Sequence, residues 1–360
     1  MKLKTRVTHI LKIEHPVVQA PMAGGPTTPE LVAAVSNTGG LGSLGAAYLP
    51  PEILRQQVRE IRHRTGGPFN VNLFVPSPFE ADPERIERSG ELLEPYRAEL
   101  GIQDPEMPSS FEESFDDQLQ VILEEKVPVF SFTFGVPGRE HLRRLCDADI
   151  ITVGTATTVR EGLRLEESGV DVVVAQGGEA GGHRGTFLGD FRDALIGTMA
   201  LVPQMVDALS VPVIASGGIM DGRGLAAALV LGAEAAQMGT AFLTCEESGA
   251  HPVFKKAVLG AAEDETAVTL AFSGRAARGI KNRFLVEVGE YEEELPPFPV
   301  QNALTKDVRA TAQRQGHPEF MSLWAGQAAQ LASPATAAQI VEGVVDGAES
   351  ALRRLAGSPT

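Results

Sequence analysis

The segment from residue 176 to residue 185, QGGEAGGHRG, places a single histidine, His183, among five glycines. Glycines allow the backbone to turn tightly and to approach a ligand closely, and an imidazole changes its charge near neutral pH. His183 is therefore a candidate general base or a polar anchor beside a ligand. The alternative is a structural side chain that bonds the loop carbonyls. The neighbouring Arg184 could attract an anion or extend into solvent.

Two further glycine-bearing segments carry the pattern of an anion site. ASGGIMDGRG contains Gly217 and Gly218, and QMGTAFL contains Gly239 and Thr240. The first follows the seventh predicted strand and the second overlaps the eighth. In a barrel, loops at these positions often bind phosphate through backbone amides. Each pair taken alone also suits a tight strand-to-helix turn, but the two together favour a phosphorylated ligand.

Three side chains at other predicted strand ends suggest that this ligand is flat. Asn72 in NVN and Gln176 can each donate and accept hydrogen bonds, which suits the edge of a heteroaromatic ring. Met22 in QAPMAGG could pack on the face of such a ring. The alternatives are that Met22 fills the core and that Asn72 belongs to a turn or caps a helix.

The elements that must position these residues alternate between short apolar runs and helical patterns. Runs such as VDVVVAQ and VPVIAS are apolar without alternation, as in strands of a parallel sheet that is covered on both faces. The eight predicted strands are 16–20, 41–44, 70–74, 127–134, 149–155, 170–176, 211–216 and 235–243. Eight such units predict an α/β fold, a closed TIM (β/α)8 barrel with a small additional lobe.

Helices are predicted between these strands, and two regions interrupt the repeat. The predicted helices are 29–38, 51–64, 221–231 and 336–355. Residues 76–126 are expected to form helices inserted between the third and fourth strands. Residues 245–300 are expected to form a small lobe that covers the active site at the barrel mouth. The barrel itself is assigned to residues 1–244 and 301–360.

Composition excludes several classes of protein. The chain has 360 residues and a net charge of −16, which opposes binding to nucleic acid or to an anionic membrane. Its two cysteines, Cys146 and Cys245, form no metal or disulfide pattern and suit a reducing cytoplasm. The sequence contains no P-loop, GxSxG or HExxH motif, and no GxGxxG follows the first strand. We expect a cytoplasmic enzyme without a metal; the sequence does not predict its oligomeric state.

The ordered set QAPMAGG, NVNLF, QGGEAGGHRG, ASGGIMDGRG, QMGTAFL and SGRAARGIKN resembles the nitronate monooxygenases, formerly called 2-nitropropane dioxygenases, from about residue 14 to residue 327. The resemblance implies a noncovalent FMN and the oxidation of an alkyl nitronate by molecular oxygen to a carbonyl compound and nitrite. His183 matches the family's active-site histidine. The FMN contacts that it implies are Met22, Asn72, Gln176, Gly181, Gly218, Gln237, Met238, Gly239 and Thr240.

The resemblance also implies roles for residues around the substrate. His183 could deprotonate a neutral nitroalkane or orient an anionic nitronate, and Lys306 and Arg184 are possible partners of the anion. Phe298 stands where relatives often carry a tyrosine. Two alternatives stay open: an FMN-dependent NAD(P)H reductase of quinones or enoyl thioesters, and a flavin-binding protein without turnover.

Overall fold

Eight parallel strands form the centre of the molecule, which a computed structural model describes for residues 3–103, 105 and 110–357. Their order is β1-β9-β8-β6-β5-β4-β3-β2, and a parallel bridge between Val18 and Leu41 joins β1 to β2. The strands are β1 (Val17–Gln19), β2 (Gly42–Gly45), β3 (Phe69–Phe74), β4 (Val129–Thr133), β5 (Ile151–Ala156), β6 (Val172–Gln176), β8 (Val213–Ser216) and β9 (Ala235–Met238). The predicted (β/α)8 barrel is confirmed.

The eighth strand is shorter than its sequence predicts. Pairing of β9 with β1 ends where Met238 lies opposite Gln19, and residues 240–243 form the short helix α10 (Thr240–Leu243) instead of strand. Ala241, Phe242 and Leu243 are buried. An apolar run that continues past a strand cannot be told from a buried helical turn by its periodicity, which explains the error.

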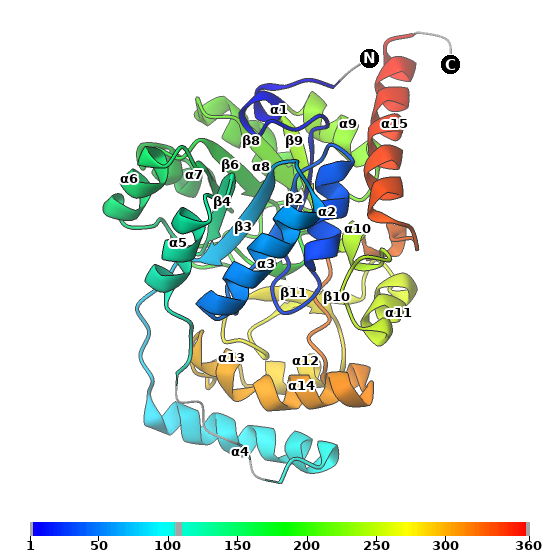
Figure 1. The fold of residues 1–360 in the computed structure, drawn as a ribbon. Helices are drawn as coiled ribbons and strands as arrows, with labels where there is room; N and C mark the ends of the chain where they lie inside the picture. The colour runs from blue at the N-terminus through cyan, green and yellow to red at the C-terminus, as the bar shows by residue number, and fades with distance from the viewer. Residues whose placement is uncertain (1–2, 104, 106–109, 358–360) are drawn as a thin grey trace.

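Helices surround the barrel, and their ends follow local sequence signals. Thr28 and Thr336 cap α2 and α15 with their hydroxyl groups, and Pro51 opens α3, where a proline is tolerated because that amide needs no partner. The helices that cover the barrel are α2 (Pro29–Asn37), α3 (Pro51–Arg64), α5 (Phe115–Glu124), α6 (Arg139–Asp147), α7 (Val159–Glu167), α8 (Thr198–Ala208), α9 (Gly222–Val230) and α15 (Ala337–Leu355). Figure 1 shows them around the sheet, with α1 (Arg6–Ile10) at the end of the barrel opposite the lobe.

A second layer of structure lies across the carboxyl ends of the strands (Figure 1). Its three-stranded antiparallel sheet has the order β10-β11-β7. The elements of this layer are β7 (Gly182–His183), β10 (Thr266–Thr269), β11 (Ala277–Ile280), α4 (Pro83–Leu100), α11 (Pro252–Gly260), α12 (Arg283–Gly289), α13 (Val300–Leu304) and α14 (Lys306–Gln315). The strand β7 was not predicted, and it joins the glycine-rich loop of His183 to this sheet.

The lobe has a hydrophobic cluster of its own. This cluster contains residues of α4, which comes from the inserted segment 76–126, and residues between Leu243 and Ala329. The other inserted helix, α5, packs against α3 and β3 of the barrel. The division at residues 245 and 300 stays a prediction, and the cluster draws on residues from both sides of that range.

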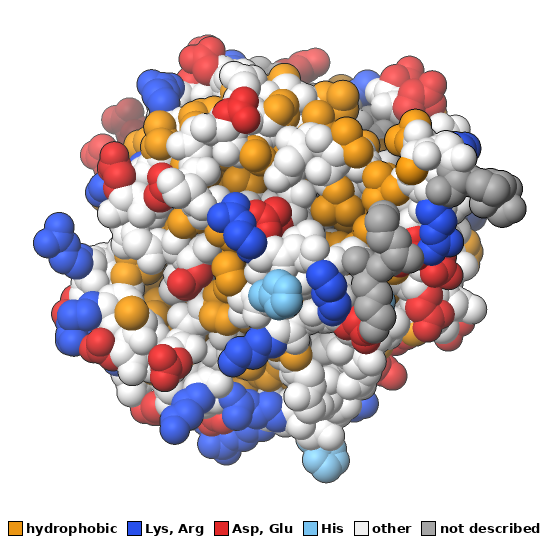
Figure 2. Space-filling view, turned by 90° about the horizontal axis from the view of Figure 1, so that it is seen from above, with side chains coloured by type: hydrophobic (Ala, Val, Ile, Leu, Met, Phe, Trp, Pro, Cys, Tyr) orange, Lys and Arg blue, Asp and Glu red, His pale blue; other side chains and the backbone are white. Residues whose placement is uncertain are grey.

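The surface at the opposite end of the barrel, seen in Figure 2, carries acidic and basic side chains interspersed with scattered hydrophobic ones. Within the described residues, no helix is both long enough and apolar enough to cross a membrane.

Candidate active site

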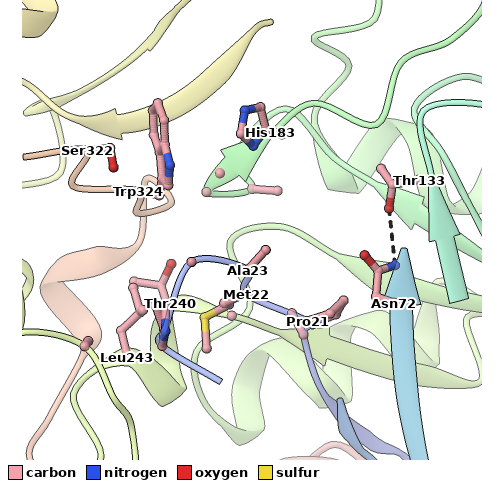
Figure 3. A pocket seen from close by; sticks show the side chains of 18 of the residues that line it. Pro21, Met22, Ala23, Asn72, Thr133, His183, Thr240, Leu243, Ser322 and Trp324 are labelled. Carbon is pink, nitrogen blue, oxygen red and sulfur yellow. Dashed lines mark hydrogen bonds between the residues drawn. The ribbon is translucent and has the colours of Figure 1, made fainter. Parts of the chain in front are cut away.

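A cavity of about 610 Å³ lies at the carboxyl ends of the barrel strands, between the barrel and the lobe. Figure 3 shows its walls, with Asn72 and Met22 on the barrel side and His183 and Trp324 on the lobe side. Every residue predicted for the site lines it: Met22, Asn72, Gln176, Gly181, His183, Gly217, Gly218, Gln237, Met238, Gly239 and Thr240. The structure brings these residues together, while their contacts with a ligand stay predictions.

The two glycine loops lie side by side because β8 and β9 pair in parallel, with Ser216 opposite Gln237. Gly217 and Gly218 have φ angles of +117° and +70°, which residues with a Cβ rarely adopt. The amides of Gly218, Gly239 and Thr240 have no acceptor in the part of the chain that the structure describes. This end of the cavity therefore presents free backbone donors.

Thr240 adds a hydroxyl group to this set of donors. Its oxygen accepts a hydrogen bond from the amide of Gly326 at 3.0 Å. The hydroxyl hydrogen can then point into the cavity. The Thr240 side chain stands beside Met22 in Figure 3.

The two amide side chains of the site are engaged to different extents. Asn72 donates from Nδ2 to Ser131 Oγ at 2.9 Å, which leaves its oxygen on the cavity wall. Gln176 donates from Nε2 to the carbonyl of His183 at 3.0 Å and accepts from the amide of Gly185 at 2.8 Å. Gln176 thus holds the glycine-rich loop in place, and one of its N–H groups is left for a ligand.

That loop also fits closely against the segment before α15. A Cβ on Gly181 would lie 2.5 Å from the carbonyl carbon of Ala325 and from the amide of Gly326. No side chain fits there, so the position requires glycine. The close approach fixes where the chain leaves the barrel before it reaches His183.

His183 belongs to β7, where it pairs with Ala277 of β11. Its Nε2 lies 2.9 Å from Ser273 Oγ, so the ring forms a hydrogen bond with a side chain and not with a loop carbonyl. Around its ring lie the rings of Phe74, Phe134, Phe298 and Trp324, at centroid distances of 6.0, 5.8, 6.1 and 5.6 Å. Burial, with the nearby charges of Arg275 and Arg309, lowers the pKa of His183 to about 3. The imidazole is therefore neutral at neutral pH.

Arg184 does not have either of the roles expected of it. It is 1% exposed, and its guanidinium donates to the carbonyls of Gly177, Gln176 and Ala194 at 2.6, 3.0 and 3.2 Å. Burial lowers its pKa to about 10. Its side chain satisfies carbonyls beneath the loop, so it neither attracts an anion in the cavity nor extends into solvent.

Tyr48 and Arg309 line the cavity and were not predicted from the sequence. Tyr48, three residues beyond β2, has a buried hydroxyl with no hydrogen-bond partner among the described residues, and burial raises its pKa to about 12. Arg309 of α14 donates to uncharged groups, Thr305 Oγ1 at 3.1 Å and Asn302 Oδ1 at 3.0 Å. Tyr48 could have been found by extending the strand-end search to the second strand. No local signal places α14 over the barrel mouth.

Lys306, the other expected anion partner, also lines the cavity beside Arg309. Phe298 faces His183 and Phe74 from the lobe side. Among the residues described, no group of His, Cys, Asp and Glu side chains could hold a metal ion. The chemistry of the cavity is therefore that of amide donors at one end and of cations, a tyrosine and a neutral histidine at the other.

A barrel with a cavity of this kind at its carboxyl face belongs to the class in which that face binds the ligand. The sequence profile described as "Nitronate monooxygenase" matches residues 4–347. Probable nitronate monooxygenases of Staphylococcus haemolyticus and Staphylococcus saprophyticus are 47% and 46% identical to this chain, over 98% of it and over 99% and 100% of their own lengths.

Solved structures agree with this assignment. A nitroalkane oxidase from Streptomyces ansochromogenes superimposes with a TM-score of 0.91 at 40% identity, over 98% of this chain and 100% of its own. FabK from Thermotoga maritima superimposes with a TM-score of 0.78 at 33% identity, over 98% of this chain and 99% of its own. The chain belongs to the nitronate monooxygenase family and is an oxidoreductase of that type.

Proposed function

We propose that this protein is an FMN-dependent monooxygenase that oxidises anionic alkyl nitronates, such as propionate 3-nitronate, with molecular oxygen to a carbonyl compound and nitrite. The observation that carries the proposal is the polarity of one cavity. Amides of adjacent loops that have no acceptor among the described residues line one end, and Arg309, Lys306, Tyr48 and neutral His183 line the other.

The residues at the barrel end fit the cofactor. The amides of Gly218, Gly239 and Thr240 would hold its phosphate, since unpaired N–H groups are the donors that a phosphate needs. Met22, Asn72 and Gln176 would contact its ring system. When bound, FMN supplies the chemistry of accepting electrons from the nitronate and passing them to oxygen.

The residues at the lobe end fit an anion. A buried tyrosine hydroxyl without a partner costs free energy unless a ligand accepts its hydrogen bond, and Tyr48 is such a donor. Arg309 has uncharged protein partners, so its charge is available to a nitronate or a carboxylate. Lys306 stands next to it on the same wall. A nitronate that carries a carboxylate would offer two negative groups to these three donors.

His183 is better suited to orient a nitronate than to remove a proton from a neutral nitroalkane. A general base works best when its pKa lies near the operating pH, whereas burial and two arginines hold the pKa of His183 at about 3. A bound anion would raise this pKa because it favours the protonated ring. The preformed nitronate is therefore the proposed substrate.

The test is anaerobic mixing of the purified yellow protein with propionate 3-nitronate. We expect the flavin absorbance to bleach, nitrite to appear when air is admitted, and NADH to bleach the flavin slowly when no nitronate is present. Rapid bleaching by NADH without response to nitronate would instead identify an FMN-dependent NAD(P)H reductase. A colourless protein that takes up no added FMN would contradict both, and a yellow one that responds to neither reagent would be a flavin-binding protein without turnover.

A further inference from the structure

Ser273 is the hydrogen-bond partner of His183, and its place in the lobe is tightly fixed. It is 1% exposed and lies in the turn before β11. The next residue, Gly274, has a φ angle of +73°, and a Cβ there would lie 2.4 Å from the carbonyl oxygen of Pro296. The turn therefore cannot shift without moving the segment around residue 296. Only the hydroxyl hydrogen of Ser273 is free to rotate.

That hydrogen has two possible acceptors. Ser273 Oγ lies 3.0 Å from the carbonyl oxygen of Arg275 and 2.9 Å from His183 Nε2. The backbone of Arg275 is held in position by its own side chain. The Arg275 guanidinium donates to the carbonyl of Thr186 and stacks over Phe134, with its central carbon 3.7 Å from the ring centre. A serine has one hydrogen to donate, so it can bond one of these acceptors at a time.

The choice determines which proton His183 presents to the cavity. When Ser273 donates to the Arg275 carbonyl, His183 Nε2–H donates to Ser273. The lone pair of Nδ1 then has no partner among the described residues, on a ring that lines the cavity. When Ser273 donates to Nε2, the proton of the neutral imidazole sits on Nδ1 and can be donated to a ligand. The first state contains one more hydrogen bond in the protein alone, while the second suits an anion.

We propose that Ser273 is a positioning residue that sets the tautomer of His183. In the ligand-free enzyme its hydroxyl donates to the Arg275 carbonyl and keeps the imidazole proton on Nε2. When an anion lies against the ring, the hydroxyl turns to Nε2, so that Nδ1–H donates to the anion while the ring stays neutral. That this anion is a nitronate rests on the proposed function, whereas the tautomer of His183 can be measured without a nitronate.

The experiment is nitrogen NMR of the holoenzyme labelled with ¹⁵N in its histidine rings, in which protonated and unprotonated ring nitrogens resonate apart. His183→Asn identifies the signals. We expect the proton on Nε2 without ligand and on Nδ1 with saturating nitrite, used as the anionic probe. A tautomer that nitrite leaves unchanged, or a ring that is protonated on both nitrogens with nitrite, would overturn the proposal.

Variants extend this measurement to function. Ser273→Ala should give a mixture of tautomers without ligand and lower kcat/KM for ethyl nitronate about tenfold, while Ser273→Thr, which keeps the hydroxyl, should restore both. The control is Ser89→Ala. Ser89 lies in α4, and its buried hydroxyl donates to Gln301 Oε1 at 2.7 Å. This substitution should change neither the tautomer of His183 nor kcat/KM. If the wild type releases no nitrite from any nitronate, the proposed function fails, and the NMR result still decides the role of Ser273.

Discussion

The two ends of the cavity are built in different ways. At the barrel end, the donors proposed to hold the phosphate are backbone groups, the amides of residues that follow the adjacent strands β8 and β9. The lobe end consists of side chains from distant parts of the chain: Tyr48 follows β2, His183 lies on β7 and Arg309 lies on α14. The barrel end is therefore suited to a cofactor that is always present. The lobe end is suited to a substrate, and its side chains determine which substrates bind. Three predictions test this comparison.

The largest effect is expected at the barrel end. Gly218→Glu places a carboxylate at the loop proposed to hold a phosphate, and repulsion between like charges should weaken FMN binding about a hundredfold or more. The measurement is the flavin content after purification and the dissociation constant on reconstitution. Gly101→Glu is the matched control, since Gly101 ends α4 at a φ of +73°, close to the +70° of Gly218, and no atom of the described residues lies within 4 Å of its Cβ position. Equal flavin loss in both variants would assign the effect to backbone strain.

A smaller effect, of a different kind, is expected at the lobe end. Arg309→Gln removes a charge and should raise KM for propionate 3-nitronate by about tenfold or more, as for loss of a hydrogen bond to a charged group, with FMN content unchanged. The rise should be smaller for ethyl nitronate, which carries one negative charge. Arg314→Gln changes an exposed arginine of the same helix and serves as the control. Loss of flavin from Arg309→Gln would show that the two ends are not separate.

The smallest effect concerns stability. The pKa of His183 is about 3 in the folded protein, against 6.5 ordinarily, so below pH 6.5 the unfolded chain binds a proton that the folded one does not. The stability contributed by the neutral ring is complete above pH 6.5 and is lost as the pH falls from there towards 3. Relative to His183→Asn, the wild type should lose about 1 kcal/mol of stability for each pH unit over this range. Urea unfolding of both proteins at several pH values measures the difference, and parallel curves would contradict the lowered pKa.

The same contrast explains what the sequence could predict. The strands and most helices follow from local patterns, so α3 and the barrel were correctly placed, and the glycine loops could be assigned to one site because parallel pairing makes successive strand ends neighbours. The eighth strand was extended into α10 because both are apolar. Arg184 was misjudged because its sequence neighbours do not show that it is buried under three carbonyls.

The lobe end could not be predicted because its geometry is tertiary. Ser273 reaches His183 across 90 positions of sequence, and β7 has two residues, too few for any periodicity. Arg309 lies on a helix whose position over the barrel depends on its packing with α4 and the rest of the lobe cluster. Nothing in the residues next to it in sequence encodes that position.

The pairing of β7 with β11 ties the lobe to the barrel through the very strand that carries His183. If the lobe moved away from the barrel as a rigid body, either His183 would move away from the proposed cofactor or the pairing of β7 with β11 would break. Ser110–Glu113 line the same cavity and are exposed or half-buried, so this part of the wall can admit a ligand while the small sheet stays intact. Substitutions in these four residues would change the rates at which substrate binds and product leaves, while the reaction at the cofactor stays the same.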